Sequence, residues 1–475
     1  MSHWPLSISK SLVALLNICL PVVLSRMLAI EDLAVYKIFF LYAVIGPWTW
    51  LASAIDNGVY TWSQVKGSMR LVGSSFVMAL AVSGLWFLGI FVLSDVLLPL
   101  LDLPKEYGVY FALIASVPKL SVIAESCLIA DGKIMRVSLF HAAFEIIRLS
   151  AVIVVAFYTS SLELVLLSYT ILVCLKGVII IPQAVDFSRL ELPRLEDLKV
   201  VSKYITPLLV AILAEVLINE FDKILLIQQM SKTDYAFFIV GCLVIPPLGI
   251  IENSACSVLI TKLANKGKER IGEGWMEYRK AVADISFVMI PAVFAMYIFS
   301  DEIVTFLYGE KFSQSGVYFS YFVFSYLALI IPHDAVARAL QDSRWMMRNN
   351  IKVALCALPI SFIAVWFFGI EGAFAAILIK AFLLRGFGFF YCRRAANWST
   401  QKMLPFSKLG EYTLASLLAA MVIFFLKGFA VYERYWLFLG GATFSVLYLT
   451  MTTCDFWFAK MGRWSWSKKL KFYYR

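Results

Sequence analysis

Long apolar stretches alternate with short polar segments along the whole chain, and each stretch is long enough to cross a lipid bilayer. A spanning helix needs roughly 20 mostly apolar residues. The apolar runs are continuous and show no strict alternation, which favours helices over the strands of a membrane barrel. The sequence therefore predicts an all-α polytopic membrane protein with about 14 transmembrane helices. The expected spans are 8–29, 33–55, 73–98, 107–130, 137–158, 162–184, 203–222, 234–258, 283–308, 315–339, 350–369, 372–392, 409–428 and 435–456.

The composition agrees with that pattern, since 61% of the 475 residues are hydrophobic and 16% are charged. The formal net charge of +10 would by itself suit a nucleic-acid-binding protein. With a cytoplasmic amino terminus, however, the cytoplasmic segments hold about four times as many Lys and Arg residues as the external ones. This is the positive-inside pattern, and it predicts that both termini are cytoplasmic. The basic tail 460–475 is expected to lie against anionic lipid headgroups, and no nucleic acid is expected as a partner.

Cysteine and histidine usage argues against redox and metal chemistry. The eight cysteines stand singly without a CxxC pair, so neither a disulfide framework nor a metal site is indicated. Only three histidines are present, which does not suit a histidine-rich membrane metalloenzyme. We therefore expect no metal and no cofactor. The opening segment MSHWPLSISK lacks the features of a cleavable signal, and the first helix is expected to remain as a signal anchor.

Two parts of the chain resemble each other in sequence and in phase. Tyr107–Phe111 (YGVYF) opens the fourth span and Ser315–Phe319 (SGVYF) opens the tenth, while Ala130–Met135 aligns with Gln341–Met346. Six spans separate each match, so the two halves would share one orientation across the membrane. The alternative is convergent composition. The predicted parts are a six-helix bundle at 1–200, which includes the basic linker that starts at 185, a second bundle at 201–397, and two further helices with the basic tail at 398–475.

Ionisable residues inside the predicted spans are the candidate functional residues, because a charge in hydrocarbon is costly unless it faces a partner or a cavity. Arg385, near the cytoplasmic end of its span, can simply reach the headgroups. The other cations are Lys37, Lys119, Arg148, Lys176, Arg338 and Lys380. The acids are Glu125, Glu145, Glu215, Glu220 and Asp334, with Asp56, Asp222, Glu252 and Asp284 nearer helix ends.

Spacing along the helices pairs some of these charges. His141, Glu145 and Arg148 lie at i, i+4 and i+7 on one face of the fifth span, where Glu145 can bond either neighbour. This group suits a functional site and a self-neutralising structural cluster equally well. Asp334 and Arg338 repeat the i, i+4 spacing on the tenth span, and here the spacing favours a structural pair.

Three lysines have no acidic residue three or four positions away, so no carboxylate on their own helix neutralises them: Lys37, Lys119 and Lys176. Lys37 lies about one turn inside its span and can reach outward to the headgroups. Lys119 is deeper and follows Pro118, which favours a cavity-lining role. Lys176 and Lys380 also lie deep in their spans. We predict unpaired cations at Lys119, Lys176 and Lys380.

A carboxylate and two helix interruptions indicate where ion coupling and movement could occur. Glu215 lies in the interior of the seventh span among Leu and Ile, with no cation one turn away. A buried carboxylate of this kind suits a proton-coupled step, and a hydrogen bond to another helix is the alternative. Gly46-Pro47 and Pro246-Pro247 interrupt the second and eighth spans at matching places. Matching interruptions point to hinges near a binding site, with packing kinks as the alternative.

Two segments of the second half resemble a known family. Ile218–Ile227 (INEFDKILLI) resembles the acidic-basic end of a helix in bacterial polysaccharide flippases, and Phe306–Phe312 (FLYGEKF) is similar to their LfGeeY element. These Wzx-like proteins move lipid-linked oligosaccharides in O-antigen and capsule assembly. They belong to the multidrug/oligosaccharidyl-lipid/polysaccharide (MOP) exporter superfamily. The Gly-rich turn usual after the first helix is replaced here by Ala29–Ala34, which makes the first-half match weaker.

The resemblance implies a V-shaped core of two six-helix bundles plus two extra helices. The implied activity is translocation of an undecaprenyl-pyrophosphate-linked oligosaccharide across the bacterial inner membrane, coupled to H+ or Na+. Membrane lipids and a glycan polymerase are the further partners that this role implies. Fixed cations would hold the pyrophosphate. The candidates are Lys119, Arg148, Lys176, Lys380, Lys37 and Arg338 for pyrophosphate, and Glu215, Glu145, Asp222, Glu125 and Asp334 for ion coupling.

Other functions fit the sequence less well. The chain has no GxxxxGK[ST] motif, so an ion gradient is the expected energy source of an alternating-access flippase. A MATE-like small-molecule or cation antiporter is expected to have fewer Lys and Arg residues inside its spans and no extra pair of helices. A membrane polymerase or acyltransferase of glycan assembly would need a large extramembrane catalytic loop or an active histidine. A scaffold without transport activity would not explain the intramembrane cations. We therefore predict a transporter and not an enzyme.

Overall fold

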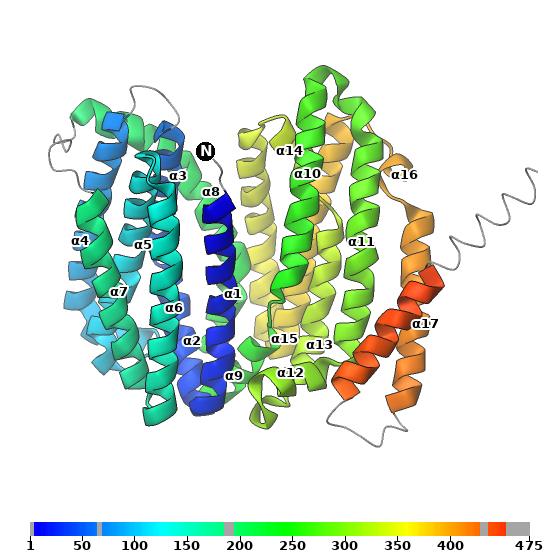
Figure 1. The fold of residues 1–475 in the computed structure, drawn as a ribbon, viewed down its shortest axis with the longest axis horizontal. Helices are drawn as coiled ribbons and strands as arrows, with labels where there is room; N and C mark the ends of the chain where they lie inside the picture. The colour runs from blue at the N-terminus through cyan, green and yellow to red at the C-terminus, as the bar shows by residue number, and fades with distance from the viewer. Residues whose placement is uncertain (1–3, 64–68, 185–193, 428–435, 453–475) are drawn as a thin grey trace, which may run out of the picture. The chain divides into compact units, whose positions relative to one another are not determined.

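The computed structural model describes residues 4–63, 69–184, 194–427 and 436–452. Within these residues the chain folds into helices joined by short turns, with no strand (Figure 1). The predicted all-α class is confirmed. The expected positions of the basic tail at 460–475 and of most of the linker that starts at 185 lie outside the described residues. Packing divides the chain into two compact units.

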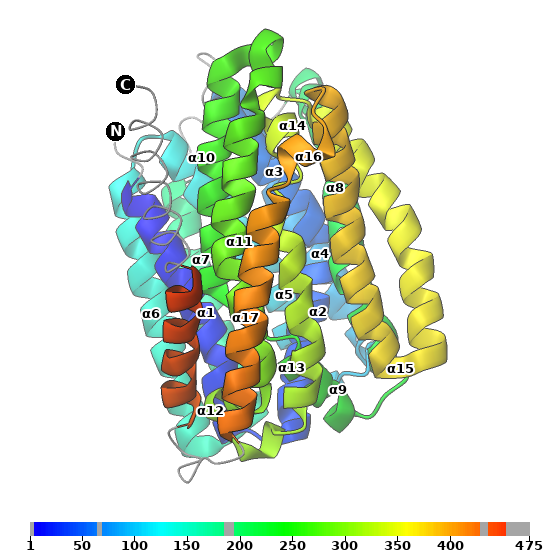
Figure 2. The same cartoon turned by 90° about the vertical axis from the view of Figure 1, so that its right-hand side faces the viewer.

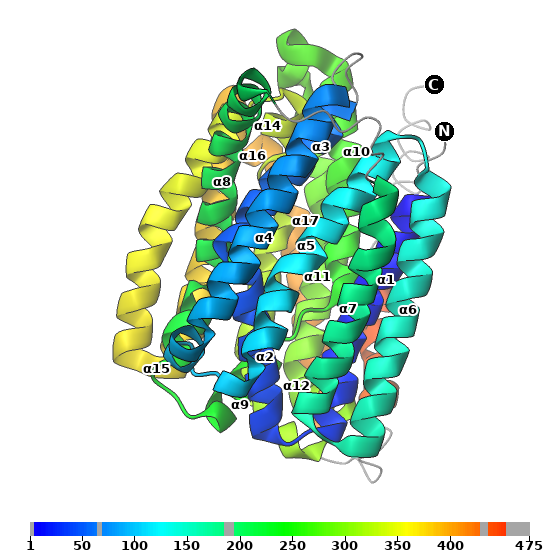
Figure 3. The ribbon, with the colours of Figure 1, turned by 90° about the vertical axis from the view of Figure 1, so that its left-hand side faces the viewer.

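The first unit comprises Met1–Ile239, Leu307–Lys311 and Asn350–Ala376. Its helices are α1 (Trp4–Met27), α2 (Ile30–Ile45), α3 (Pro47–Ser63), α4 (Met69–Leu100), η1 (Lys105–Tyr107), α5 (Gly108–Ala130), α6 (Ile134–Thr159), α7 (Leu162–Ala184), α8 (Leu195–Ile227) and most of α9 (Lys232–Gly241). The central helix is α5, which contacts α2, α3, α4, α6 and α7. Figure 3 shows α4, α5, α7 and α6 running along one another, with α1 beside α6.

An apolar core joins α3, α4, α5 and α8. It contains Trp48, Ile55, Ile123 and Val201, which are all buried. The indole N–H of Trp48 donates to the backbone carbonyl of Ser116 at 3.0 Å, so the polar atom of this side chain is satisfied inside the core. Because α8 packs on α2, α3 and α4, it belongs to the first unit. The predicted division of the chain at 200 and 397 stays a prediction.

The second unit comprises Val240–Phe306, Phe312–Asn349 and Ile377–Arg475. Its elements are α10 (Pro246–Arg270), η2 (Ile271–Gly274), α11 (Trp275–Ile298), most of α12 (Ser300–Tyr308), the last residue of η3 (Glu310–Phe312), α13 (Ser315–Phe322), η4 (Val323–Ile330), α14 (Ala335–Ala339), the two ends of α15 (Ser343–Ala395), α16 (Thr400–Met403), α17 (Phe406–Lys427) and a helix at Trp436–Thr452. Figure 2 shows α11 between α10 and α17, and the contacts agree.

The membrane-spanning pattern follows the hydropathy of the sequence. Eight helices of the described residues are long and apolar enough to cross a membrane, and the bent pair α2 and α3 would add a ninth. Two of the eight are helix pairs merged across a kink: Pro246–Ile298 spans 53 residues and Arg344–Ala395 spans 52, too long for one crossing. Shorter apolar helices at Ser315–Ile330 and Trp436–Thr452 match the tenth and fourteenth predicted spans.

The structure has a helix break at both predicted interruptions. The axes of α2 and α3 differ by 52° across Gly46, where the backbone is extended before Pro47. At the second interruption the expected helix 234–258 is wrong, because α9 ends at Gly241 and α10 begins only at Pro246. Proline at the first helical position has no N–H to satisfy, whereas proline inside a helix breaks it. The role of these breaks as hinges stays a prediction.

Turns of one type follow α5 and α14. Gly132 is left-handed with φ 84°, and the Lys133 N–H donates to the Leu128 carbonyl. Gln341 is left-handed with φ 57°, and the Asp342 N–H donates to the Ala337 carbonyl. Both turns are therefore of the Schellman type. In the structure the residue that corresponds to Gly132 is Gln341. The sequence alignment had paired Gly132 with Ser343, two residues further along. The duplication itself stays a prediction.

Asp342 shows why a carboxylate stands after the second of these turns. It caps α15 by accepting hydrogen bonds from the Tyr391 hydroxyl at 2.8 Å and from the Trp345 N–H at 3.0 Å. These two bonds hold the pKa of Asp342 below its usual value. The stability that they contribute is therefore lost as the pH falls through this lowered pKa.

Gly369 divides α15 into the two spans that the sequence predicted there. Its φ of 55° and ψ of −125° lie in a region that essentially only glycine adopts. Three residues later, a Cβ on Gly372 would lie 1.9 Å from the carbonyl oxygen of Ala364. Both glycines are therefore needed for the kink in α15.

We expect Gly369→Ala and Gly372→Ala each to destabilise the protein by about 1–3 kcal/mol, through backbone strain and a steric clash respectively. Gly386→Ala, on the same helix, is the matched control because no atom lies within 4 Å of its Cβ position. It should be neutral or slightly stabilising. Thermal unfolding of the purified protein measures the difference. A melting temperature that falls equally in all three variants would contradict this account of the turn.

Candidate functional site

Three consecutive helices of the first unit bring ionisable side chains to one level. The turn at Gly132 reverses the chain between α5 and α6. Glu125 lies five residues before the end of α5, and His141 lies seven residues after the start of α6. Lys176 lies eight residues before the end of α7, which returns along α6. At 1.5 Å per residue, all three side chains start about 8–12 Å from the ends of their helices.

Lys176 is the link between the helices. Its ammonium group lies 2.9 Å from Glu125 Oε1 and 3.4 Å from Glu145 Oε1. It also lies 3.2 Å from Nδ1 of His141. The same Nδ1 is 3.0 Å from Glu125 Oε2. One cation on α7 thus bridges a carboxylate on α5 and a carboxylate on α6.

Arg148 completes the group one turn deeper on α6. Its guanidinium forms an ion pair with Glu145, three residues earlier on the same helix. It also donates to the side-chain carbonyl of Asn17 on α1 at 2.8 Å. Its carbon Cζ lies 4.4 Å from the ring centre of Tyr169 on α7, within the range of a cation–π contact. Arg148 therefore ties α1, α6 and α7 together.

We call Glu125, His141, Glu145, Arg148 and Lys176 the charge cluster. The two acids are each 7% exposed, and Arg148 and Lys176 are 5% and 8% exposed. Two carboxylates face two permanent cations, so the cluster is electrically neutral when His141 is neutral. A neutral, fully paired arrangement is what allows these groups to be buried, because one unpaired charge here would be costly.

His141 has two competing hydrogen-bond partners on one nitrogen atom. If Lys176 donates to Nδ1, that nitrogen carries no proton and repels the carboxylate of Glu125. If Nδ1 carries a proton, it donates to Glu125 and the contact with Lys176 is lost. The geometry can thus hold either of two hydrogen-bond patterns that differ in the position or number of protons. The cluster is chemically suited to taking up and releasing one proton.

Part of this cluster follows the sequence prediction. The expected shared face of His141, Glu145 and Arg148 is present, and Glu145 bonds Arg148. The expectation that Lys176 is unpaired is wrong, because its carboxylate partners lie on α5 and α6 and not on its own helix. Spacing within one helix cannot detect such a pair. Glu125 and His141 lie seven and nine residues from Gly132, and these similar distances from one tight turn were the sequence signal that the two side chains meet.

The remaining candidates of the first unit lie outside the cluster. Lys119 is half-buried on α5, where Asp56 on α3 acts on it electrostatically. Lys37 on α2 is half-buried and has an interaction of its own. Asp222 on α8 is buried and also has an interaction. Glu215 is exposed on α8, so the expectation that it is buried is wrong.

In the second unit, two ion pairs join residues of that unit. Asp334 and Arg338 form the expected i, i+4 salt bridge at 2.6 Å, with Arg338 exposed. Arg385 was expected to reach the headgroups, and this is wrong. Its guanidinium bonds Glu252 on α10 at 2.8 Å and the Ile331 carbonyl at 3.0 Å.

The pairing of Arg385 with Glu252 was missed because the two residues lie 133 positions apart. Lys380, predicted to be an unpaired cation, is buried on α15 and has an interaction of its own, so it is not free.

Comparison with known proteins places the chain in a family. The family model of polysaccharide biosynthesis proteins matches residues 23–317, which is more than half of the chain. The chain belongs to the polysaccharide biosynthesis protein family. The resemblance first seen in Ile218–Ile227 and Phe306–Phe312 is thereby confirmed at the family level. No curated protein matches this family member in a direct search.

Solved structures show the fold of this polysaccharide biosynthesis protein. Lipid II flippase MurJ, in an inward closed conformation, matches with a TM-score of 0.72 and 16% identity over 95% of this chain and 98% of that one. An inward-facing MATE family multidrug resistance transporter of the MOP superfamily matches with a TM-score of 0.62 and 16% identity. That match covers 81% of this chain and 94% of the transporter.

A MOP superfamily transporter from Pyrococcus furiosus also matches, with a TM-score of 0.57 and 16% identity over 83% of this chain and 94% of that one. The predicted MOP-type fold of this multi-pass membrane protein is confirmed.

Proposed function

We propose that this protein is a flippase, which moves a pyrophosphate-linked oligosaccharide lipid across the bacterial inner membrane by alternating access, driven by a proton gradient. The observation that carries the proposal is the polysaccharide biosynthesis family match over residues 23–317. Hydrophilic sugars and a pyrophosphate group cannot cross hydrocarbon unaided. A family that works on polysaccharides, with the fold of membrane transporters, therefore fits transfer of the lipid-linked precursor across the membrane.

The extent of the structural matches favours a flippase over an antiporter. The match to the lipid II flippase extends over 95% of this chain, whereas the match to the MATE transporter covers 81%. The sequence predicts two helices beyond a twelve-helix core, and α17 and the helix Trp436–Thr452 stand in their place. These helices are therefore accounted for by the flippase comparison.

The charge cluster is the proposed coupling element. Arg148 and Lys176 are held by Glu145 and Glu125, so neither cation is available to an anion while both acids are ionised. Protonation of one carboxylate would release positive charge, and a bound pyrophosphate would in turn favour that protonation. Proton and substrate occupancy are then linked through one set of side chains. The originally predicted role of Arg148 and Lys176 as simple pyrophosphate ligands is replaced by this coupled one.

The same geometry favours H+ over Na+ as the coupling ion. A sodium site needs several oxygen ligands around an open position. In the charge cluster the oxygens of Glu125 and Glu145 already face the ammonium of Lys176 and the guanidinium of Arg148. A proton can enter such a site without displacing a cation, since it needs only a lone pair on a carboxylate or on His141.

Lys119, Lys37 and Lys380 remain candidates for contact with the pyrophosphate. Glu215 remains a second candidate for ion coupling, because an exposed carboxylate in the middle of a spanning helix needs water or a polar partner and not lipid. Asp222 and Asp334 are weaker candidates, since both already have partners. The two termini are proposed to be cytoplasmic, and a glycan polymerase is the proposed consumer of the flipped lipid.

Flipping in proteoliposomes tests the proposal. The full chain is reconstituted with a fluorescent undecaprenyl-pyrophosphate-linked oligosaccharide and, separately, with a fluorescent phospholipid. We expect the oligosaccharide lipid to cross at least about tenfold faster than the phospholipid, a difference of about 1.4 kcal/mol in barrier height. A pH gradient should accelerate only the first. Exchange of protons for a cationic dye, without movement of either lipid, would instead identify an antiporter.

A further inference from the structure

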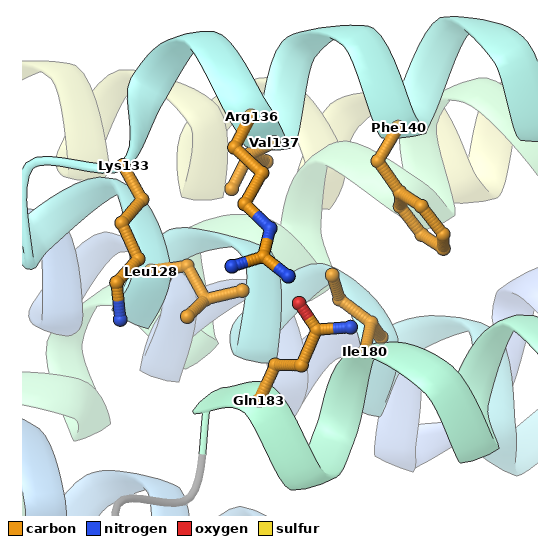
Figure 4. Close-up of a pocket in the computed structure, with 7 residues that line it drawn as sticks. All are labelled: Leu128, Lys133, Arg136, Val137, Phe140, Ile180 and Gln183. Carbon is orange, nitrogen blue, oxygen red and sulfur yellow. The ribbon is translucent and has the colours of Figure 1, made fainter.

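A pocket of about 280 Å³ lies beside the Gly132 turn, between the end of α5, the start of α6 and the end of α7. Its floor is apolar, formed by Leu128, Val137 and Ile180, which belong to the buried core of the first unit. Its rim is polar. Figure 4 shows Lys133 and Arg136 at one edge and the Gln183 amide at the other, with the Arg136 guanidinium pointing across the opening toward Gln183.

The positive charge of the rim favours an anionic ligand. Among the lining residues two are cations and none is an acid. Lys133 forms a salt bridge of 3.0 Å with Asp131, in which the two side chains are 44% and 32% exposed. Pairs exposed to this extent are weak, so Lys133 can turn to another anion at little cost. Arg136 offers a planar fork that suits the oxygens of a phosphate group. A path for protons or metal cations would not be lined in this way.

The shape and the position of the pocket favour the phosphate group of a lipid as the ligand. An apolar floor under a cationic rim matches a molecule with a phosphate group and a hydrocarbon part. The positive-inside distribution of Lys and Arg places this end of the bundle at the cytoplasmic leaflet, where anionic lipids attract basic groups. The pocket volume of about 280 Å³ lies just below the 300–1,000 Å³ typical of drug-sized ligand sites, so it suits a small group.

The pocket also adjoins the charge cluster. Leu128 follows Glu125 by about one turn, and Ile180 follows Lys176 by one turn. Val137 precedes His141 by one turn on α6. A single layer of apolar side chains therefore separates the pocket from the buried ion pairs. A negative charge held at the rim would act on the cluster through this low-dielectric layer.

We infer that this pocket is a binding site for the phosphate group of an anionic lipid, held by Lys133 and Arg136 with the amide of Gln183 and seated on Leu128, Val137 and Ile180. The binding holds whether or not the chain moves a pyrophosphate-linked lipid, because the ligand is defined by a phosphate group with net negative charge and not by its glycan. A lipid bound at this site would place its negative charge about one helical turn away from the charge cluster.

Lipid titration of the full chain in phosphatidylcholine nanodiscs tests this site. Fluorescent short-chain phosphatidic acid is the lipid probe, and inorganic pyrophosphate is the soluble probe. We expect Lys133→Gln with Arg136→Gln to weaken phosphatidic acid binding by about tenfold. Gln183→Trp should weaken it to a similar degree without any change of charge, because the indole would fill the pocket.

Arg393→Gln with Arg394→Gln is the matched control. Both arginines are exposed at the end of α15 that is predicted to be cytoplasmic, and their replacement removes the same net charge. This control should bind phosphatidic acid like the unchanged protein. An equal loss in both double variants would mean a general charge effect and would overturn the site. Unchanged binding in the Gln183→Trp variant would also overturn it, and tighter binding of pyrophosphate than of phosphatidic acid would overturn the lipid assignment. Thermal unfolding of each variant confirms that the fold is intact.

Discussion

Replacement of Arg148 by methionine is expected to destabilise the protein by about 3 kcal/mol and to abolish flipping. The substitution leaves Glu145 with Lys176 as its remaining cation, at 3.4 Å, and gives the buried cluster a net negative charge. Breaking one partner of a buried pair costs about 3–5 kcal/mol, and the remaining contact offsets part of that. The double substitution Arg148→Met with Glu145→Gln restores neutrality. It should recover most of the melting temperature but none of the transport, because the Glu145–Arg148 pair of the coupling element is then absent.

The separation of stability from transport is what distinguishes a functional cluster from a structural one. Arg270→Met is the matched control, since Arg270 also pairs with an acid three residues away, Glu273, but is 71% exposed. An exposed pair contributes only about 0–1 kcal/mol, so this variant should melt and transport like the unchanged protein. Recovery of flipping together with stability in the double variant would show that the charge cluster only holds the helices together.

The fold could be read from the sequence because its main determinant is local. A helix that crosses hydrocarbon must be apolar over its whole length, so hydropathy alone locates most of the spans. The interruptions at Gly46-Pro47 and Pro246-Pro247 were also predictable, since proline chemistry acts within one turn. The predicted ends of the helices were less accurate. The structure carries α10 on to Arg270 and starts α11 at Trp275, because charged residues such as Lys and Glu are good helix formers outside the membrane.

The candidate site could be predicted only where its contacts lie on one helix. The Glu145–Arg148 and Asp334–Arg338 pairs follow from spacing. The bond from Lys176 to Glu125 depends on how α5 and α7 face each other, and the sequence does not specify the rotation of a helix about its axis when most of its surface is apolar.

The same limit explains the error at Glu215. Position within a span gives the depth of a side chain but not the direction in which it points, and the structure exposes this carboxylate. Pairing across helices must therefore come from coordinates.

Glu125→Gln is expected to remove the pH dependence of flipping and to slow gradient-driven flipping at least about tenfold, or about 1.4 kcal/mol. The amide keeps the size of the side chain but cannot take up a proton, and it deprives both His141 and Lys176 of their carboxylate partner on α5. The groups left to face these two are Glu145 and Arg148 on α6. Exchange of labelled lipid without a pH gradient should persist, because it needs no net proton movement.

The measurement is the initial rate of flipping in proteoliposomes between about pH 5.5 and pH 8, the range in which an ordinary histidine side chain changes charge. Glu125→Asp is the control, since it keeps a titratable group on the same backbone position and should retain a pH-dependent, although slower, rate. A wild-type pH profile in Glu125→Gln would place the coupling proton outside the charge cluster. Glu215, exposed on α8, would then be the carboxylate to replace next, because it lies in the interior of a predicted span with no cation one turn away on its own helix.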